Sequence, residues 1–180
     1  MLRFGLAATA IGAAALQLDP FGLGWLGAVL FGVGALGMVY GAAGAARRRM
    51  LRRTVEGLQR LAPGEFEGAV AGWLRRAGWK VEQIGGPGDG GIDLVARRGS
   101  ETAVVQCKRL APGGTVGAPT VRDLYGAASA RGASIAVLVT TGRVSQAART
   151  WVEGLPAGPR VELFDADRVA AAARRGRMLD

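Results

Sequence analysis

Apolar positions between residues 62 and 175 follow two different spacings. From Pro63 to Trp79 they recur every three or four residues, which places them on one face of a helix. From Ser134 to Thr140 they form an unbroken run, as in a central strand that is covered on both faces of its sheet. The same two patterns predict further strands over residues 79–84, 92–97, 101–108 and 160–165, and further helices over residues 120–131, 144–154 and 166–175.

These elements follow one another in the order α-β-β-β-α-β-α-β-α. The first three strands are joined by tight turns, at the Gly-rich residues 85–91 and at Arg98–Ser100, whereas the later strands alternate with helices. This order predicts an α/β fold in which a mixed sheet is flanked by helices.

The first 46 residues differ from the rest, because Arg3 and Asp19 are their only charged side chains. The uncharged stretch Phe21–Ala46 has 26 residues, and as a helix it would be roughly 39 Å long, more than the ~30 Å of a hydrocarbon core. We interpret it as a membrane span, since a buried core helix would need a larger protein around it. Residues 4–18 are either a first span, which would give a transmembrane helical hairpin, or the apolar part of a signal peptide.

A cluster of arginines follows the apolar stretch, five of them between Arg47 and Arg53. Arginines beside a span favour the cytoplasmic side, so the sequence predicts an inner (plasma) membrane protein whose C-terminal domain faces the cytoplasm. Three regions result: a membrane anchor over residues 1–46, a basic juxtamembrane tether over 47–61, and the α/β domain over 62–180.

Composition limits the chemistry of that domain. The chain has one cysteine and no histidine, so an intrachain disulfide framework, Ser/His/Asp and Cys/His catalysis and His-ligated zinc sites are all excluded. An enzyme built from this chain must use carboxylates, amides, hydroxyls, lysine or a hard metal ion. The net charge of +9 falls to +4 over residues 54–180, which by itself does not predict strong DNA binding.

One group of residues has the composition of a catalytic site. Side chains alternate between the faces of a strand, so Gln106 and Lys108 point one way while Cys107 points toward the core. Asp93 begins the preceding strand, at the end of the hairpin where Gln106 and Lys108 emerge. A carboxylate, an amide oxygen and an ammonium group would then share one small volume.

Such a group suits cleavage of a phosphodiester. Mg²⁺ prefers oxygen ligands, here Asp93 and the side-chain oxygen of Gln106, while Lys108 would orient the attacking water. "GDGG" alone is a common hairpin turn, and we interpret Asp89 as a turn residue. The choice of lysine at position 108 favours a catalytic role. Lys80 and Lys108 are the only lysines among 23 basic residues, and the pKa of a lysine is more easily shifted by its surroundings than that of an arginine.

The motifs "FEGAV", "GDGGIDL" and "VVQCKR" resemble the Mrr-like restriction endonuclease family, within the PD-(D/E)xK nuclease superfamily. The resemblance covers roughly residues 62–175 and includes "VTTG" at Val139–Gly142. It implies a restriction-endonuclease-like fold and Mg²⁺-dependent cleavage of DNA. By position, Asp93 matches the metal-binding aspartate, Lys108 the catalytic lysine, and Gln106 a residue that is acidic in most of the superfamily. Glu67 matches a first-helix glutamate that adds to metal binding, although an acid in a first helical turn is also favourable with the helix dipole.

The expected function is therefore a membrane-anchored, Mg²⁺-dependent DNA endonuclease, acting in restriction of foreign DNA. Its expected partners are DNA and the lipid bilayer, and a homodimer would supply the two active sites that cleavage of both strands requires. Arg109, Arg122, Arg143 and Arg149 either hold the phosphate backbone or form a solvated face. The alternative is a catalytically inactive, membrane-bound DNA-binding or scaffold protein.

Overall fold

The computed structural model describes residues 24–51, 54–84 and 91–179. The chain divides into two compact units, Met1–Met50 and Leu51–Asp180, which are described separately below. The predicted first apolar segment, residues 4–18, and the turn residue Asp89 lie outside the described residues.

The first unit contains the helix α2 (Gly24–Leu51), 28 residues long. Several of its large apolar side chains are exposed, among them Val33, Val39 and Tyr40 at 61, 64 and 71%. Glycine and alanine occupy many of the positions between them. Within the described part of the chain, no helix combines the length and the apolarity that a membrane crossing requires. The span predicted over residues 21–46 is therefore not found there, and membrane attachment stays a hypothesis.

The second unit is built on a five-stranded mixed sheet with the order β1-β2-β3-β5-β7. The antiparallel part joins β1 (Lys80–Gln83), β2 (Leu94–Arg98) and β3 (Glu101–Lys108). The parallel part adds β5 (Ile135–Thr140) beside β3 and β7 (Arg160–Phe164) beside β5. This arrangement confirms the predicted mixed sheet.

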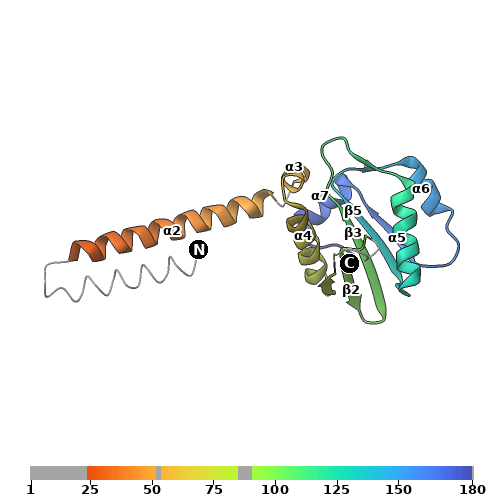
Figure 1. Ribbon diagram of the computed structural model, residues 1–180, viewed down its shortest axis with the longest axis horizontal. Coiled ribbons are helices and arrows are strands. Elements are labelled where there is room, and N and C mark those ends of the chain that lie inside the picture. The colour runs from red at the N-terminus through yellow and green to blue at the C-terminus, as the bar shows by residue number, and fades with distance from the viewer. Residues whose placement is uncertain (1–23, 52–53, 85–90, 180) are drawn as a thin grey trace. The chain divides into compact units, whose positions relative to one another are not determined.

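Helices cover both faces of this sheet, as Figure 1 shows. One apolar core lies under α4 (Pro63–Arg76) and α7 (Ala166–Arg175), and α3 (Val55–Gln59) adds Leu58 to it. The other core lies under α5 (Ala118–Ala130) and α6 (Gln146–Glu153). β5 is buried along its whole length, as expected of a strand that is covered on both faces.

The boundaries of these elements follow from local chemistry. Pro63 stands in the first turn of α4, where its missing N–H leaves no intrahelical hydrogen bond unmade, and Gly78 follows the helix with a φ of +88°. Asp165 caps α7 by accepting a hydrogen bond from the backbone N of Arg168. A short parallel pair that the sequence pattern did not predict, β4 (Thr115–Val116) with β6 (Arg143–Val144), joins the segment between β3 and α5 to the segment between β5 and α6.

Candidate functional site

The candidate site lies where β2 begins and β3 ends. These strands are antiparallel, and Leu94 pairs with Val105, so the residue before Leu94 lies beside the residue after Val105. The structure thus brings Asp93 and Gln106 together at one end of the sheet. Lys108 is the last residue of β3, two positions further along the strand.

Asp93 is held on both sides by neighbouring strands. Its backbone N donates to the carbonyl of Val105 at 2.9 Å, and its own carbonyl accepts from the backbone N of Ile84 at 3.0 Å. Its carboxylate Oδ2 accepts a 2.6 Å hydrogen bond from the backbone N of Cys107. The carboxylate is therefore fixed against the end of β3, in a position that does not depend on a flexible loop.

Gln106 is buried, with 6% of its surface exposed. Its side-chain Oε1 is the buried side-chain atom that accepts no hydrogen bond within the described residues. An unpaired buried acceptor costs about 1–3 kcal/mol of folding free energy, so such atoms are rare unless they have a ligand. Among the buried side-chain atoms of the described residues, the one without a hydrogen-bond partner is thus the amide oxygen that we expected to bind a cation.

Gly91 leaves room for that amide. It has a φ of +75°, which L side chains rarely adopt, and a Cβ added there would lie 2.6 Å from Nε2 of Gln106. The absence of a side chain at Gly91 thus lets the backbone approach the amide of Gln106.

Glu67 lies on α4, which packs on the sheet, and it is close enough to Asp93 for the charge of Asp93 to act on it. Burial raises the pKa of its carboxyl above the ordinary 4.5, and the negative charge of Asp93 raises it further. A cation between the carboxylates of Glu67 and Asp93 would offset this repulsion. Among the described residues there is no group of three or more His, Cys, Asp or Glu side chains arranged for a metal, so Gln106 would have to supply the third oxygen.

Cys107 lies between these groups but faces the apolar core under α4, as its position in the strand predicts. Burial raises the pKa of its thiol well above the usual value, and the charges of Asp93 and Glu67 raise it further. The thiol is therefore neutral at physiological pH, which excludes it as a nucleophile or a thiolate ligand.

Lys108 is exposed, and the alternation along β3 places it on the same face as Gln106. Its backbone carbonyl accepts a 2.7 Å hydrogen bond from the hydroxyl of Thr140, and that hydroxyl in turn accepts from the backbone N of Gly142 at 3.0 Å. Thr140 is completely buried. The last residue of β3 is thus tied to the end of β5 by a side chain as well as by the sheet.

Thr141 also joins the segments that follow β3 and β5. The hydroxyl of Thr141 accepts from the backbone N of Leu110 at 2.8 Å and donates to the carbonyl of Leu110 at 3.0 Å. Gln59 of α3 donates to the carbonyl of Thr141, and its own carbonyl accepts from Arg109. Sequence reasoning assigned no role to either threonine, although two polar residues directly after a fully apolar strand were a signal.

The four arginines expected either to hold phosphates or to be solvated have varied surroundings. Arg109 bonds to Gln59, Arg149 forms an ion pair with Asp165, and Arg122 lies 5.8 Å from the ring centre of Trp151. Arg143 is exposed and lines a shallow hollow beside Gly142. Arg143 and Arg149 line one hollow together, which Arg109 and Arg122 do not line, and only Arg109 directly follows the candidate site in sequence.

The oxygen donors fit a hard divalent cation. Asp93 and Glu67 would supply carboxylate oxygens and Gln106 an amide oxygen, which are the ligands that Mg²⁺ prefers. The unpaired Oε1 of Gln106 is the observation that makes this fit more than a matter of residue type.

Comparison with known proteins gives a family match for this unit. Residues 58–173 match a family of restriction endonuclease catalytic domains of the Mrr type. The chain is 34% identical over 109 residues to the type IV methyl-directed restriction enzyme EcoKMrr of Escherichia coli K12, covering 56% of this chain and 35% of that protein. It therefore spans about a third of the length of this curated relative.

Two solved structures are similar. The DNA modification-dependent restriction endonuclease AspBHI has a TM-score of 0.54 at 23% identity, covering 71% of this chain and 35% of that one. The MspJI restriction endonuclease, solved with a 27-mer oligonucleotide, has a TM-score of 0.46 at 23% identity, covering 79% of this chain and 31% of that one. The likeness to AspBHI shows a shared fold, and the family match covers more than half of the residues. The chain therefore belongs to the Mrr-type restriction endonuclease family.

Proposed function

We propose that this protein is a Mg²⁺-dependent DNA endonuclease that hydrolyses phosphodiester bonds at the end of β3. The observation that carries the proposal is the buried, unpaired Oε1 of Gln106 beside the fixed carboxylate of Asp93. The family match and the fold support it, because both belong to restriction endonucleases.

Each residue would have a distinct role. Mg²⁺, when bound, would neutralise charge on the scissile phosphate and acidify a water molecule. Asp93 and Gln106 would hold the cation from β2 and β3, and Glu67 would complete its ligands from α4. Lys108 would orient the attacking water and stabilise the charge that develops on the phosphate. Thr140 would keep Lys108 in place through its backbone carbonyl.

A plasmid assay tests this assignment. The full chain should nick supercoiled plasmid with MgCl₂ and not with EDTA, and Lys108→Ala should lose about 10²–10⁴-fold in rate, the usual contribution of a positioned general acid or base. Lys80→Ala is the matched control, because Lys80 is the other lysine and is exposed on β1. Equal nicking by the wild type and Lys108→Ala would remove the catalytic assignment. DNA binding without any nicking would favour the inactive binding protein.

The biological role that we propose is restriction of foreign DNA. The relative in Escherichia coli is described as methyl-directed, and AspBHI as dependent on DNA modification. A preference of this chain for modified DNA would appear as faster nicking of plasmid from a methylating host than of the same plasmid from a host without methyltransferases. Cleavage of both strands would require a homodimer, which sedimentation of the full chain with and without DNA would detect.

We also propose that the N-terminal region holds the nuclease at the cytoplasmic face of the inner membrane. Support comes from the uncharged stretch 21–46, the arginines that follow it and the exposed apolar side chains of α2. The protein should sediment with membranes, and removal of residues 1–50 should release it. Equal restriction of incoming DNA by the shortened and the full chain would contradict a role for membrane attachment.

A further inference from the structure

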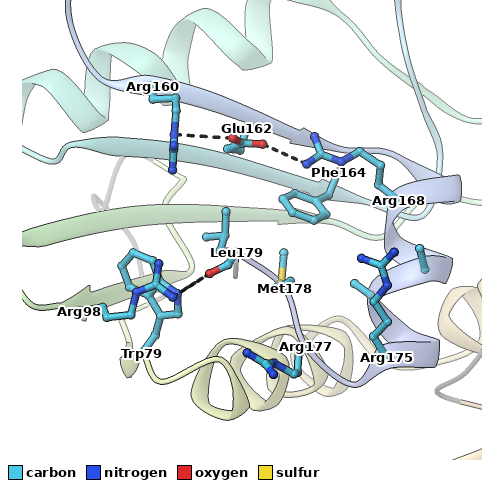
Figure 2. A pocket seen from close by; sticks show the side chains of 12 residues that line it. Trp79, Arg98, Arg160, Glu162, Phe164, Arg168, Arg175, Arg177, Met178 and Leu179 are labelled. Carbon is cyan, nitrogen blue, oxygen red and sulfur yellow. Dashed lines mark hydrogen bonds and ion pairs between the residues drawn. The ribbon is translucent and has the colours of Figure 1, made fainter.

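A second candidate site lies in a hollow of about 450 Å³ on the α7 side of the sheet. It is bounded by β7, by α7 and by the segment after α7, and Trp79 and Arg98 close it from the β1–β2 side. Its volume is in the range of pockets that hold small molecules. Figure 2 shows the guanidinium group of Arg98 on one side of it and those of Arg168 and Arg175 on the other, with Phe164 and Met178 between them.

The hollow is strongly basic. Among its described lining residues, Glu162 is the one acidic side chain. Five arginines line it: Arg98, Arg160, Arg168, Arg175 and Arg177. Glu162 is shared, since it lies 3.6 Å from Arg160 and 3.1 Å from Arg168. Arg98 is paired with Glu101 at 3.5 Å, whereas the single carboxylate of Glu162 cannot neutralise both Arg160 and Arg168, so these two arginines leave an excess of positive charge in the hollow.

Two of the arginines are held in place by the fold. The guanidinium of Arg98 lies 4.4 Å from the ring centre of Trp79 and donates to the carbonyl of Leu179 at 3.1 Å. The guanidinium of Arg168 lies 4.1 Å from the ring centre of Phe164 and donates to the carbonyl of Leu163. Their orientation is thus set before any ligand arrives, which lowers the entropy cost of binding one.

The chemistry of the lining selects a class of ligand. Trp79 and Phe164 are only 3 and 6% exposed, so their rings are not free to stack on a base. Guanidinium groups bind phosphate and carboxylate oxygens through paired N–H donors, and phosphate carries the higher charge. We propose that this hollow binds the phosphate groups of a small anionic ligand.

The position of the hollow argues against the DNA backbone as that ligand. Arg98 ends β2, whereas Asp93 precedes its beginning, a separation of roughly 17 Å at ~3.4 Å per residue. The hollow also borders the core under α7, while Gln106 lies on the face that α5 and α6 cover. The hollow is therefore separate from the candidate nuclease site, and competition with a short duplex tests whether DNA reaches it. Binding here is also independent of the nuclease assignment, and its test measures no cleavage.

Titration of the full chain with inorganic pyrophosphate, in EDTA and at constant ionic strength, tests the site by calorimetry. Saturable binding is expected. Arg175→Gln should weaken it at least about tenfold, the effect of losing one charge-assisted contact. Arg174→Gln is the matched control, because Arg174 is exposed on the same turn of α7 and does not line the hollow. Glu162→Gln should tighten binding, since it releases Arg160 and Arg168 from their shared partner.

Three results would overturn the proposal. The first is the absence of saturable pyrophosphate binding in the wild type. The second is an equal loss of affinity in Arg174→Gln and Arg175→Gln, which would mean a general charge effect. The third is displacement of pyrophosphate by a short DNA duplex that depends on Arg175, which would assign the hollow to the nucleic acid backbone.

Discussion

Replacement of Gln106 by methionine should make the metal-free protein more stable. Oε1 of Gln106 is buried and accepts no hydrogen bond in the described part of the chain. Methionine has nearly the same length and shape but no polar atom, so it can occupy the same space without an unpaired acceptor. If Gln106 serves metal binding and not folding, its replacement should raise the free energy of unfolding of the metal-free protein. Most core substitutions lower it.

The expected size follows from two opposing terms. Removal of the unpaired acceptor gains about 1–3 kcal/mol, and the exchange of one buried side chain for another of similar volume usually costs less than about 1.5 kcal/mol. The net gain is therefore about 1 kcal/mol, or a rise in Tm of roughly 2–4 °C for a chain of this size. The wild type, in contrast, should gain about 2.7 kcal/mol from Mg²⁺ at a hundredfold excess over its Kd, and the variant should gain much less.

Thermal and urea unfolding of the full chain, each with EDTA and with MgCl₂, would measure both effects. In EDTA the variant should be the more stable protein, and in MgCl₂ the order should reverse. Gln106→Leu serves as a second apolar variant in case methionine packs poorly. The reasoning would be refuted by a variant that is less stable than the wild type in EDTA, or by one that responds to Mg²⁺ as the wild type does.

Three further predictions concern residues around the site. Gly91→Ala should lose at least about 1 kcal/mol of stability and most of its stabilisation by Mg²⁺, because a Cβ at a φ of +75° would lie 2.6 Å from Nε2 of Gln106. Gly99→Ala is the control, since Gly99 has a φ of +57° and open space around it, and it should keep the stabilisation by Mg²⁺ in the same thermal unfolding measurements. Thr140→Val should cost about 1–3 kcal/mol and lower the nicking rate through Lys108, with recovery in Thr140→Ser, and an unchanged rate would contradict the positioning role. The raised pKa of Glu67 means that its ionised form destabilises the fold, so no penalty exists below pH 4.5 and the penalty grows as the pH rises through the folded pKa. Glu67→Gln should therefore stabilise the metal-free protein at neutral pH but not below pH 4.5, and a gain independent of pH would show another cause.

Much of the fold could be predicted from the spacing of apolar residues. The run Ile135–Thr140 predicted a doubly covered strand, and the stripe on Pro63–Arg76 predicted the helix that packs on one face. The pair β4–β6 could not be predicted, because two residues are too few to show a period.

The site was predictable to the extent that strand alternation and hairpin pairing determine it. These two rules place Asp93 beside Gln106 and put Cys107 on the other face, as the structure has them. The proximity of Glu67 to Asp93 depends on how α4 packs on the sheet, which the sequence reached only through a family resemblance. The roles of Gly91 and Thr140 depend on contacts between single atoms, and no pattern of residue types encodes those.

The central claim is that Asp93 holds the cation at which DNA is cleaved. The most direct measurement compares the wild type with Asp93→Asn, which keeps the shape of the side chain and removes its charge, in both Mg²⁺-induced stabilisation and nicking of supercoiled plasmid. We predict that Asp93→Asn folds, gains no stability from MgCl₂ and does not nick DNA. A folded Asp93→Asn protein that responds to Mg²⁺ and nicks plasmid at the wild-type rate would contradict the account.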